Sequence, residues 1–73
     1  MVFDKIRSII AEKLEIDETQ ITLTSTFDDL NADSLYLVEI MMAIEEEFDI
    51  SIEETDDINN VEDLVAYVAS KLN

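Results

Sequence analysis

The 73-residue chain contains no cysteine, no histidine and no glycine. Without cysteine there can be no disulfide, no thiolate nucleophile and no cysteine-based zinc site. Without histidine, a serine nucleophile has no imidazole base, and without glycine neither a P-loop nor a dinucleotide-binding turn can form. We therefore expect a protein that is not an enzyme, with no catalytic residues and no resident metal.

Basic side chains are also scarce. Only 4 Lys and Arg stand against 19 Asp and Glu, which gives a formal net charge of −15. This excludes the basic face that nucleic acid phosphates require, and an anionic membrane surface would repel the chain. The longest apolar run covers residues 40–44, far short of the ~20 residues of a membrane span, and residues 1–5 lack a signal-peptide layout. We expect a cytoplasmic protein that binds basic protein surfaces.

Two segments repeat apolar residues at helical spacing and should form the first and last helices. They cover residues 2–14 and 61–72, the latter capped by Asn60. Hydrophobic residues make up 48% of the chain, enough for the core of one domain spanning residues 1–73. The predicted apolar stripes are Phe3, Ile6, Ile10 and Leu14 in the first helix, and Val61, Leu64, Val65, Val68 and Leu72 in the last.

A further helix is expected over residues 34–48, with Asp33 as its N-cap. At about 100° per residue, its side chains separate into two faces. The predicted core stripe consists of Leu37, Met41, Ile44 and Phe48. The second face mixes apolar side chains with carboxylates, namely Leu35, Met42, Glu39 and Glu46.

Two connections join these helices. Residues 17–33 are rich in Thr and Ser, which favours a loop, and this loop should be packed on the core by Ile21, Leu23, Phe27 and Leu30. In residues 49–60, Ser51 and Glu54 fit a capping box, which predicts one short helical turn near residues 53–58. The expected fold is all-α, a small four-helix bundle. Three of the helices are principal helices, and the third in chain order is short. A long loop joins helices one and two.

Two acidic segments and the serine at the helix start each have a simple structural explanation when taken alone. Residues 29–33 open like a calcium loop, but Ser34 and Ile40 stand where an EF-hand needs Gly and Glu. The run Glu45-Glu46-Glu47 would by itself be a solvated helix face, and a Ser in the first turn of a helix is by itself usually capping chemistry.

The order of these segments along the chain indicates a more specific function than any one of them does alone. Asp33-Ser34-Leu35 opens an acidic helix that ends in Glu45-Glu46-Glu47-Phe48, and a closing helix follows. In order, spacing, length and charge, essentially the whole chain resembles the acyl carrier proteins. The resemblance implies that Ser34 carries 4′-phosphopantetheine, attached by a phosphodiester from coenzyme A, whose thiol holds acyl groups as thioesters. It also implies that Asp33 helps the modifying transferase, and free N–H groups at the helix start would suit the phosphodiester.

The resemblance also assigns two surfaces. Partner enzymes would dock through basic patches on a recognition face made of Leu35, Val38, Glu39, Met42, Glu45 and Glu46. These partners would be the holo-carrier-protein synthase (a phosphopantetheinyl transferase), malonyl transferase, ketoacyl synthases, reductases, dehydratases and acyltransferases. We expect no nucleic acid partner, no membrane insertion and a monomer. Five apolar residues are candidates for the lining of an acyl pocket, with ordinary core as the alternative role, namely Leu37, Met41, Ile52, Ile58 and Val65.

The chain departs from the family pattern in three places. Asn31 stands where Gly is common, and Asn is the residue that next best tolerates a left-handed backbone. Tyr36 stands where an acidic residue is common, and residues 52–58 are shorter than usual and lack a Pro.

We thus expect a carrier of dissociated (type II) fatty acid synthesis. Two alternatives remain at this point. The first is a carrier for polyketides or other specialised acyl or aminoacyl chains. The second, from another class, is an acidic protein-binding module without a prosthetic group. Both carrier hypotheses require that Ser34 can be modified, whereas the acidic binding module does not.

Overall fold

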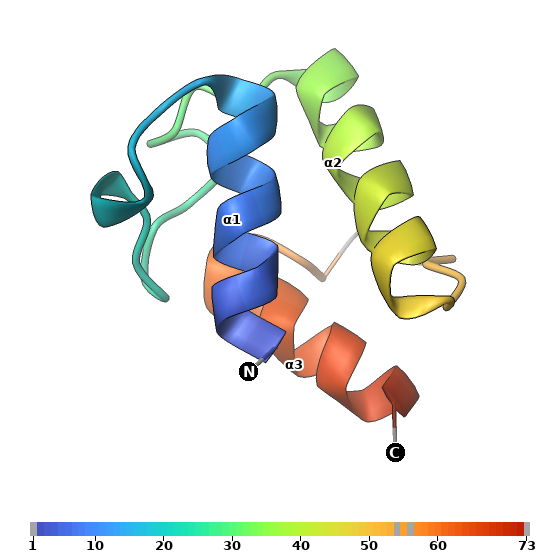
Figure 1. The fold of residues 1–73 in the computed structure, drawn as a ribbon. Helices are drawn as coiled ribbons and strands as arrows, with labels where there is room; N and C mark the ends of the chain where they lie inside the picture. Colours follow the sequence, from blue (N-terminus) through green and yellow to red (C-terminus); the bar gives the residue numbers. More distant parts are fainter. Residues whose placement is uncertain (1, 54, 56, 73) are drawn as a thin grey trace.

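The computed structural model describes residues 2–53, 55 and 57–72, and it contains three α-helices in that part of the chain. Helix α1 (Val2–Leu14) and helix α2 (Ser34–Phe48) lie side by side and run in opposite directions, while α3 (Val61–Leu72) crosses near the N-terminal end of α1 (Figure 1). A 3₁₀ turn, η1 (Glu18–Gln20), lies in the connection after α1. The three predicted α-helices are confirmed. None of the helices described is long and apolar enough to cross a membrane.

The predicted short helix near residues 53–58 is not confirmed. Two of its residues, 54 and 56, lie outside the described part of the chain, and the others have no helical structure. One turn hydrogen bond joins the Ile58 N–H group to the Thr55 carbonyl at 3.0 Å. The N–H groups of Ile52 and Glu53 are bound by side chains of α2 and α3. Over the described residues, the fold is therefore a three-helix bundle.

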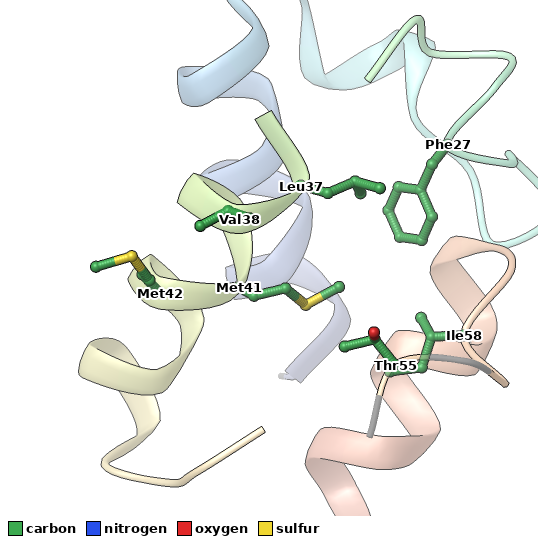
Figure 2. A pocket seen from close by; sticks show the side chains of 7 residues that line it. All are labelled: Phe27, Leu37, Val38, Met41, Met42, Thr55 and Ile58. Carbon is green, nitrogen blue, oxygen red and sulfur yellow. The ribbon is translucent and has the colours of Figure 1, made fainter. Parts of the chain in front are cut away.

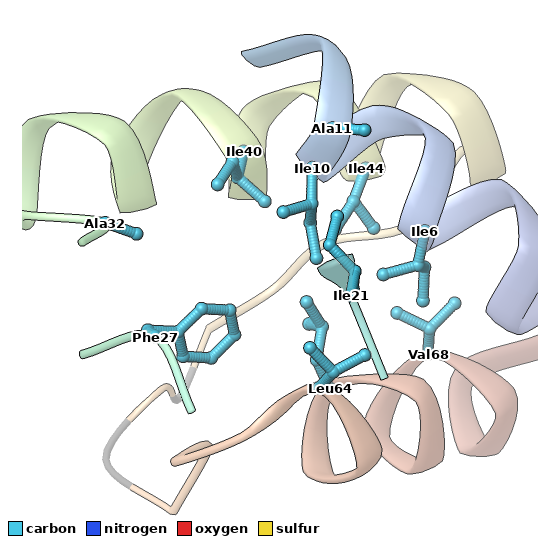
Figure 3. Close-up of a cluster of buried hydrophobic side chains, with 11 residues drawn as sticks. Ile6, Ile10, Ala11, Ile21, Phe27, Ala32, Ile40, Ile44, Leu64 and Val68 are labelled. Atoms are coloured by element: carbon cyan, nitrogen blue, oxygen red, sulfur yellow. The ribbon is translucent and has the colours of Figure 1, made fainter. Parts of the chain in front are cut away.

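The hydrophobic core lies where the three helices meet (Figure 3). On α2 the fully buried side chains are Ile40 and Ile44, while Leu37, Met41 and Phe48 are only partly buried. The predicted core stripe of α2 was therefore wrong in part, because it omitted the fully buried Ile40 and included three side chains that are only partly buried. The other helices supply the fully buried side chains Ile6 and Ile10 from α1, and Val61, Leu64 and Val68 from α3.

The connection between α1 and α2, residues 15–33, is packed on this core as predicted. Ile21 and Phe27 are buried, but Leu23 is 38% exposed. Leu23 contributes its backbone instead, because its carbonyl accepts the Glu62 N–H group at 2.9 Å, and the Ser25 carbonyl accepts that of Val61 at 3.0 Å. These N–H groups belong to the first turn of α3, where an α-helix has no internal partner for them.

The 3₁₀ turn η1 follows from one side chain. Asp17 Oδ1 accepts the Thr19 N–H group at 3.0 Å and the Thr19 hydroxyl at 3.1 Å. These two hydrogen bonds stabilise the charged carboxylate, so they hold the pKa of Asp17 below its usual value. The guanidinium group of Arg7 lies 3.5 Å from Glu18, which links η1 to α1.

Candidate functional site

Ser34 is exposed and is the first residue of α2. The residue before it, Asp33, is the N-cap, and its Oδ1 accepts the N–H groups of Leu35 at 3.1 Å and Tyr36 at 3.2 Å. The Asp33 carbonyl accepts the Leu37 N–H group at 2.9 Å, which is the first internal bond of the helix. This cap confirms the predicted start of α2 and places the Ser34 hydroxyl at its N-terminal end.

The chain bends sharply just before this cap. Asn31 has φ 60, a left-handed conformation that Asn adopts more readily than most residues with a Cβ atom. The Ala32 N–H group binds the Phe27 carbonyl at 2.9 Å, and Ala32 is buried. The backbone on the N-terminal side of Ser34 is therefore fixed by hydrogen bonds and burial.

The surroundings of Ser34 fit a covalently attached group. Ser34 is exposed, and none of the side-chain hydrogen bonds found among the described residues involves its hydroxyl. The N–H groups of Leu35 and Tyr36 are bound by Asp33, so these two are not among the free N–H groups expected to meet a phosphodiester. The positive end of the helix dipole remains beside Ser34.

An apolar cavity of about 240 Å³ opens about one turn further along α2 (Figure 2). In Figure 2, Leu37 and Met41 point toward Phe27 and Ile58 across the cavity, whereas Val38 and Met42 point outward from α2. The volume is below the ~300–1,000 Å³ of common small-molecule sites. The lining residues are Phe27, Leu37, Val38, Met41, Met42, Thr55 and Ile58.

The structure brings three of the five predicted pocket residues to this cavity, namely Leu37, Met41 and Ile58. Ile52 and Val65 do not line it and pack against the core instead. Sequence reasoning missed Phe27 and Thr55 as lining residues, and it placed Val38 and Met42 only on the recognition face. Phe27 carried a usable signal, because it is the one aromatic residue in a polar loop, but its position opposite α2 depends on tertiary folding.

The predicted recognition face separates into exposed and anchored residues. Leu35, Val38 and Met42 are 77%, 56% and 58% exposed, and they follow one another along the helix at spacings of three and four. Glu39 and Glu46 are exposed beside them. Glu45 differs, because it is half-buried and its Oε2 accepts the Ile52 N–H group at 2.7 Å.

A basic side chain adjoins this acidic surface. Lys13 of α1 shares a shallow hollow of about 190 Å³ with Glu39, Met42 and Glu46 of α2. Sequence reasoning did not place Lys13 here, since the pattern gives no register between α1 and α2. Among the described residues, no group of three or more acidic side chains is arranged to hold a metal ion.

Comparison with known proteins agrees with this geometry. A family model for the phosphopantetheine attachment site matches residues 4–68. The acyl carrier protein of Streptococcus pneumoniae is 54% identical over 67 residues, covering 92% of this chain and 90% of its own length. That of Clostridium acetobutylicum is 52% identical over 71 residues, covering 93% and 92%, and that of Streptococcus pyogenes is 49% identical over 70 residues, covering 96% and 95%.

The chain therefore belongs to the acyl carrier protein family, whose members are carriers with a covalent 4′-phosphopantetheine group and not enzymes. The prosthetic group supplies a terminal thiol that binds acyl groups as thioesters. This explains how a chain with no cysteine can hold a thioester.

Proposed function

We propose that Ser34 is the residue that bears the 4′-phosphopantetheine group, and that the chain thereby carries growing acyl chains between the enzymes of fatty acid synthesis. The observation that carries the proposal is the exposed Ser34 hydroxyl at the start of α2, inside the matched region 4–68. Leu37 and Val38, one turn along the same helix, border the apolar cavity. The chain itself presents the hydroxyl, fixes its backbone and offers an apolar surface nearby.

The cavity is the proposed binding site for the tail of the acyl chain. Leu37, Met41, Phe27 and Ile58 give it an apolar lining, and removing alkyl surface from water is favourable by about 0.8 kcal/mol per CH₂ group. We assign Ile52 and Val65 to the core rather than to this lining, because they pack against the buried cluster.

The exposed face of α2 is the proposed docking surface for partner enzymes. Leu35, Val38 and Met42 would supply apolar contact, while Glu39 and Glu46 would steer a basic patch toward Ser34. The proposed partners are the holo-carrier-protein synthase, malonyl transferase, ketoacyl synthases, reductases, dehydratases and acyltransferases. The net charge of −15 disfavours self-association, which supports a monomer, and the cytoplasm is the proposed location.

The test uses purified full-length chain, a phosphopantetheinyl transferase, coenzyme A and Mg²⁺, with intact-mass spectrometry as the readout. The parent chain should gain one phosphopantetheine group, and Ser34→Ala should gain none. Ser51→Ala is the matched control, since Ser51 is also exposed but lies in the connection after α2; it should be modified like the parent. Modification of Ser34→Ala, with its helical circular dichroism spectrum intact, would contradict the assignment.

A further inference from the structure

One wall of the cavity belongs to the connection between α2 and α3. The described residues of this pocket wall are 52, 53, 55 and 57–59, and Thr55 and Ile58 belong to the lining. Three of its described N–H groups bind side-chain acceptors on the helices. Ile52 N–H binds Glu45 Oε2 of α2 at 2.7 Å, Glu53 N–H binds the Tyr67 hydroxyl of α3 at 3.2 Å, and Asn59 N–H binds Asp63 Oδ2 of α3 at 3.0 Å.

Of these three contacts, only the one from Glu45 joins the pocket wall to α2. It is also the shortest, it is partly buried, and its acceptor is a carboxylate. Hydrogen bonds to charged acceptors are shorter and stronger than neutral ones, and partial burial limits competition from water. The Tyr67 contact is longer, exposed and uncharged.

The position of Glu45 on α2 ties this contact to the cavity. Glu45 lies four residues after Met41, so the two side chains are neighbours on one face of the helix. Met41 points into the cavity toward Ile58 of the pocket wall (Figure 2). The Glu45 side chain therefore spans from the helix that lines one side of the cavity to the start of the segment that lines the other.

We propose that Glu45 is a positioning residue that holds the pocket wall against α2 and thereby sets the width of the acyl pocket. For the identity of what fills the pocket, this inference rests on the proposed function. The half-buried carboxylate is engaged with the chain's own backbone, which sets Glu45 apart from the exposed Glu39 and Glu46. Without the Glu45 carboxylate, the Ile52 end of the wall is released, and Thr55 and Ile58 move away from α2.

The first measurement is hydrogen exchange by NMR on the full-length, unmodified chain. In Glu45→Ala, exchange of the Ile52 amide should be faster by about tenfold, the expected effect of losing one hydrogen bond to a charged group. Glu45→Gln keeps an uncharged acceptor and should give a smaller increase. Glu46→Ala removes the same charge from the neighbouring position and should leave Ile52 exchange unchanged. Tyr67→Phe should act on the Glu53 amide instead.

The second measurement follows the pocket itself. The nuclear Overhauser effect between the methyl groups of Met41 and Ile58 should weaken in Glu45→Ala and stay at the parent level in Glu46→Ala. Unchanged Ile52 exchange, or an unchanged Met41–Ile58 effect, would overturn the proposal. If Glu45→Ala fails to fold, Glu45→Gln provides both readouts. Since the chain is unmodified, these results do not depend on Ser34, and a failure of attachment at Ser34 would contradict only the proposed function.

Discussion

The two connections of this bundle are held in different ways. Residues 15–33, between α1 and α2, are bound to α3 through their own carbonyl groups and place Ile21, Phe27 and Ala32 in the core. Residues 49–60, between α2 and α3, are held mainly by side-chain acceptors, and their isoleucines Ile50, Ile52 and Ile58 are only half-buried. Both contribute to the cavity, through Phe27 and through Thr55 and Ile58.

The two ways of holding the connections match two different roles in the molecule. The first connection leads directly into Asp33 and Ser34, so its fixed backbone determines where a group attached to Ser34 begins. The second connection contains the pocket wall, and the side-chain hydrogen bonds that hold this wall can break without unfolding any helix. Under the proposed function, a fixed attachment point and an adjustable wall would suit a carrier that shields acyl chains of increasing length and then releases them.

The largest expected effect is on stability and concerns Phe27 in the first connection, residues 15–33. Phe27→Ala removes a buried aromatic ring and should lower the free energy of unfolding by about 3–5 kcal/mol, a large part of the ~5–15 kcal/mol of a typical domain. Ile58→Ala lines the same cavity from the half-buried second connection and should cost roughly 1–2 kcal/mol. Urea unfolding followed by circular dichroism measures both. Equal losses would remove the contrast between the connections.

The next largest effect is on the rate at which partner enzymes associate with α2, the helix between the two connections. Glu39→Lys or Glu46→Lys should slow association with a basic partner enzyme by up to about tenfold at low salt, and the deficit should shrink as salt rises. Lys13→Glu, in the same hollow, should accelerate association. Met42→Ala should weaken binding with little salt dependence. Stopped-flow association kinetics measure all four, and rates that are the same in every variant would remove this face from docking.

Each connection ends in an N-cap, which allows a matched comparison. Asp33 caps α2, and Asn60 caps α3 through its Oδ1, which accepts the Asp63 N–H group at 2.8 Å. Asp33→Ala and Asn60→Ala should each lower stability by about 1 kcal/mol. Thermal unfolding measures the loss. Only Asp33→Ala should also reduce the rate at which the transferase modifies Ser34, and an equal reduction in Asn60→Ala would assign the effect to general stability.

The smallest effect lies at the start of the first connection. Because Thr19 holds the folded-state pKa of Asp17 below its usual value of 3.8, the charged carboxylate stabilises the fold above that pH. This contribution is lost as the pH falls through the lowered pKa. Thermal midpoints between pH 2 and 6 should therefore show a slightly weaker acid dependence in Asp17→Asn than in the parent. A parent and variant with parallel profiles would show that the Thr19 contacts do not persist in solution.

Sequence patterns predicted the parts that local rules govern. The bounds of α1 and α2 and the Asp33 cap each depend on a few neighbouring residues. The 3₁₀ turn was missed because it depends on one Asp17 side chain, and Ile40 was missed because the core stripe of α2 is set by how α1 packs against it.

The pocket and its wall could be predicted only in part. Leu37 and Met41 follow from helical spacing, whereas Phe27 and Thr55 reach the cavity from separate connections. Glu45 belonged to an acidic run that looks uniform in sequence, yet it alone of that run binds the Ile52 N–H group. Such roles depend on tertiary contacts between residues seven or more positions apart, and no local pattern records them.

Ser34, whose backbone is fixed by the first connection, is the proposed attachment residue of the prosthetic group. The most direct test of this assignment is fragmentation mass spectrometry of the parent chain after incubation with a phosphopantetheinyl transferase and coenzyme A. We predict that every fragment containing residue 34 gains the mass of one phosphopantetheine group and that fragments lacking it gain none. The added mass on a fragment without Ser34, such as one that contains Ser51 alone, would contradict the account.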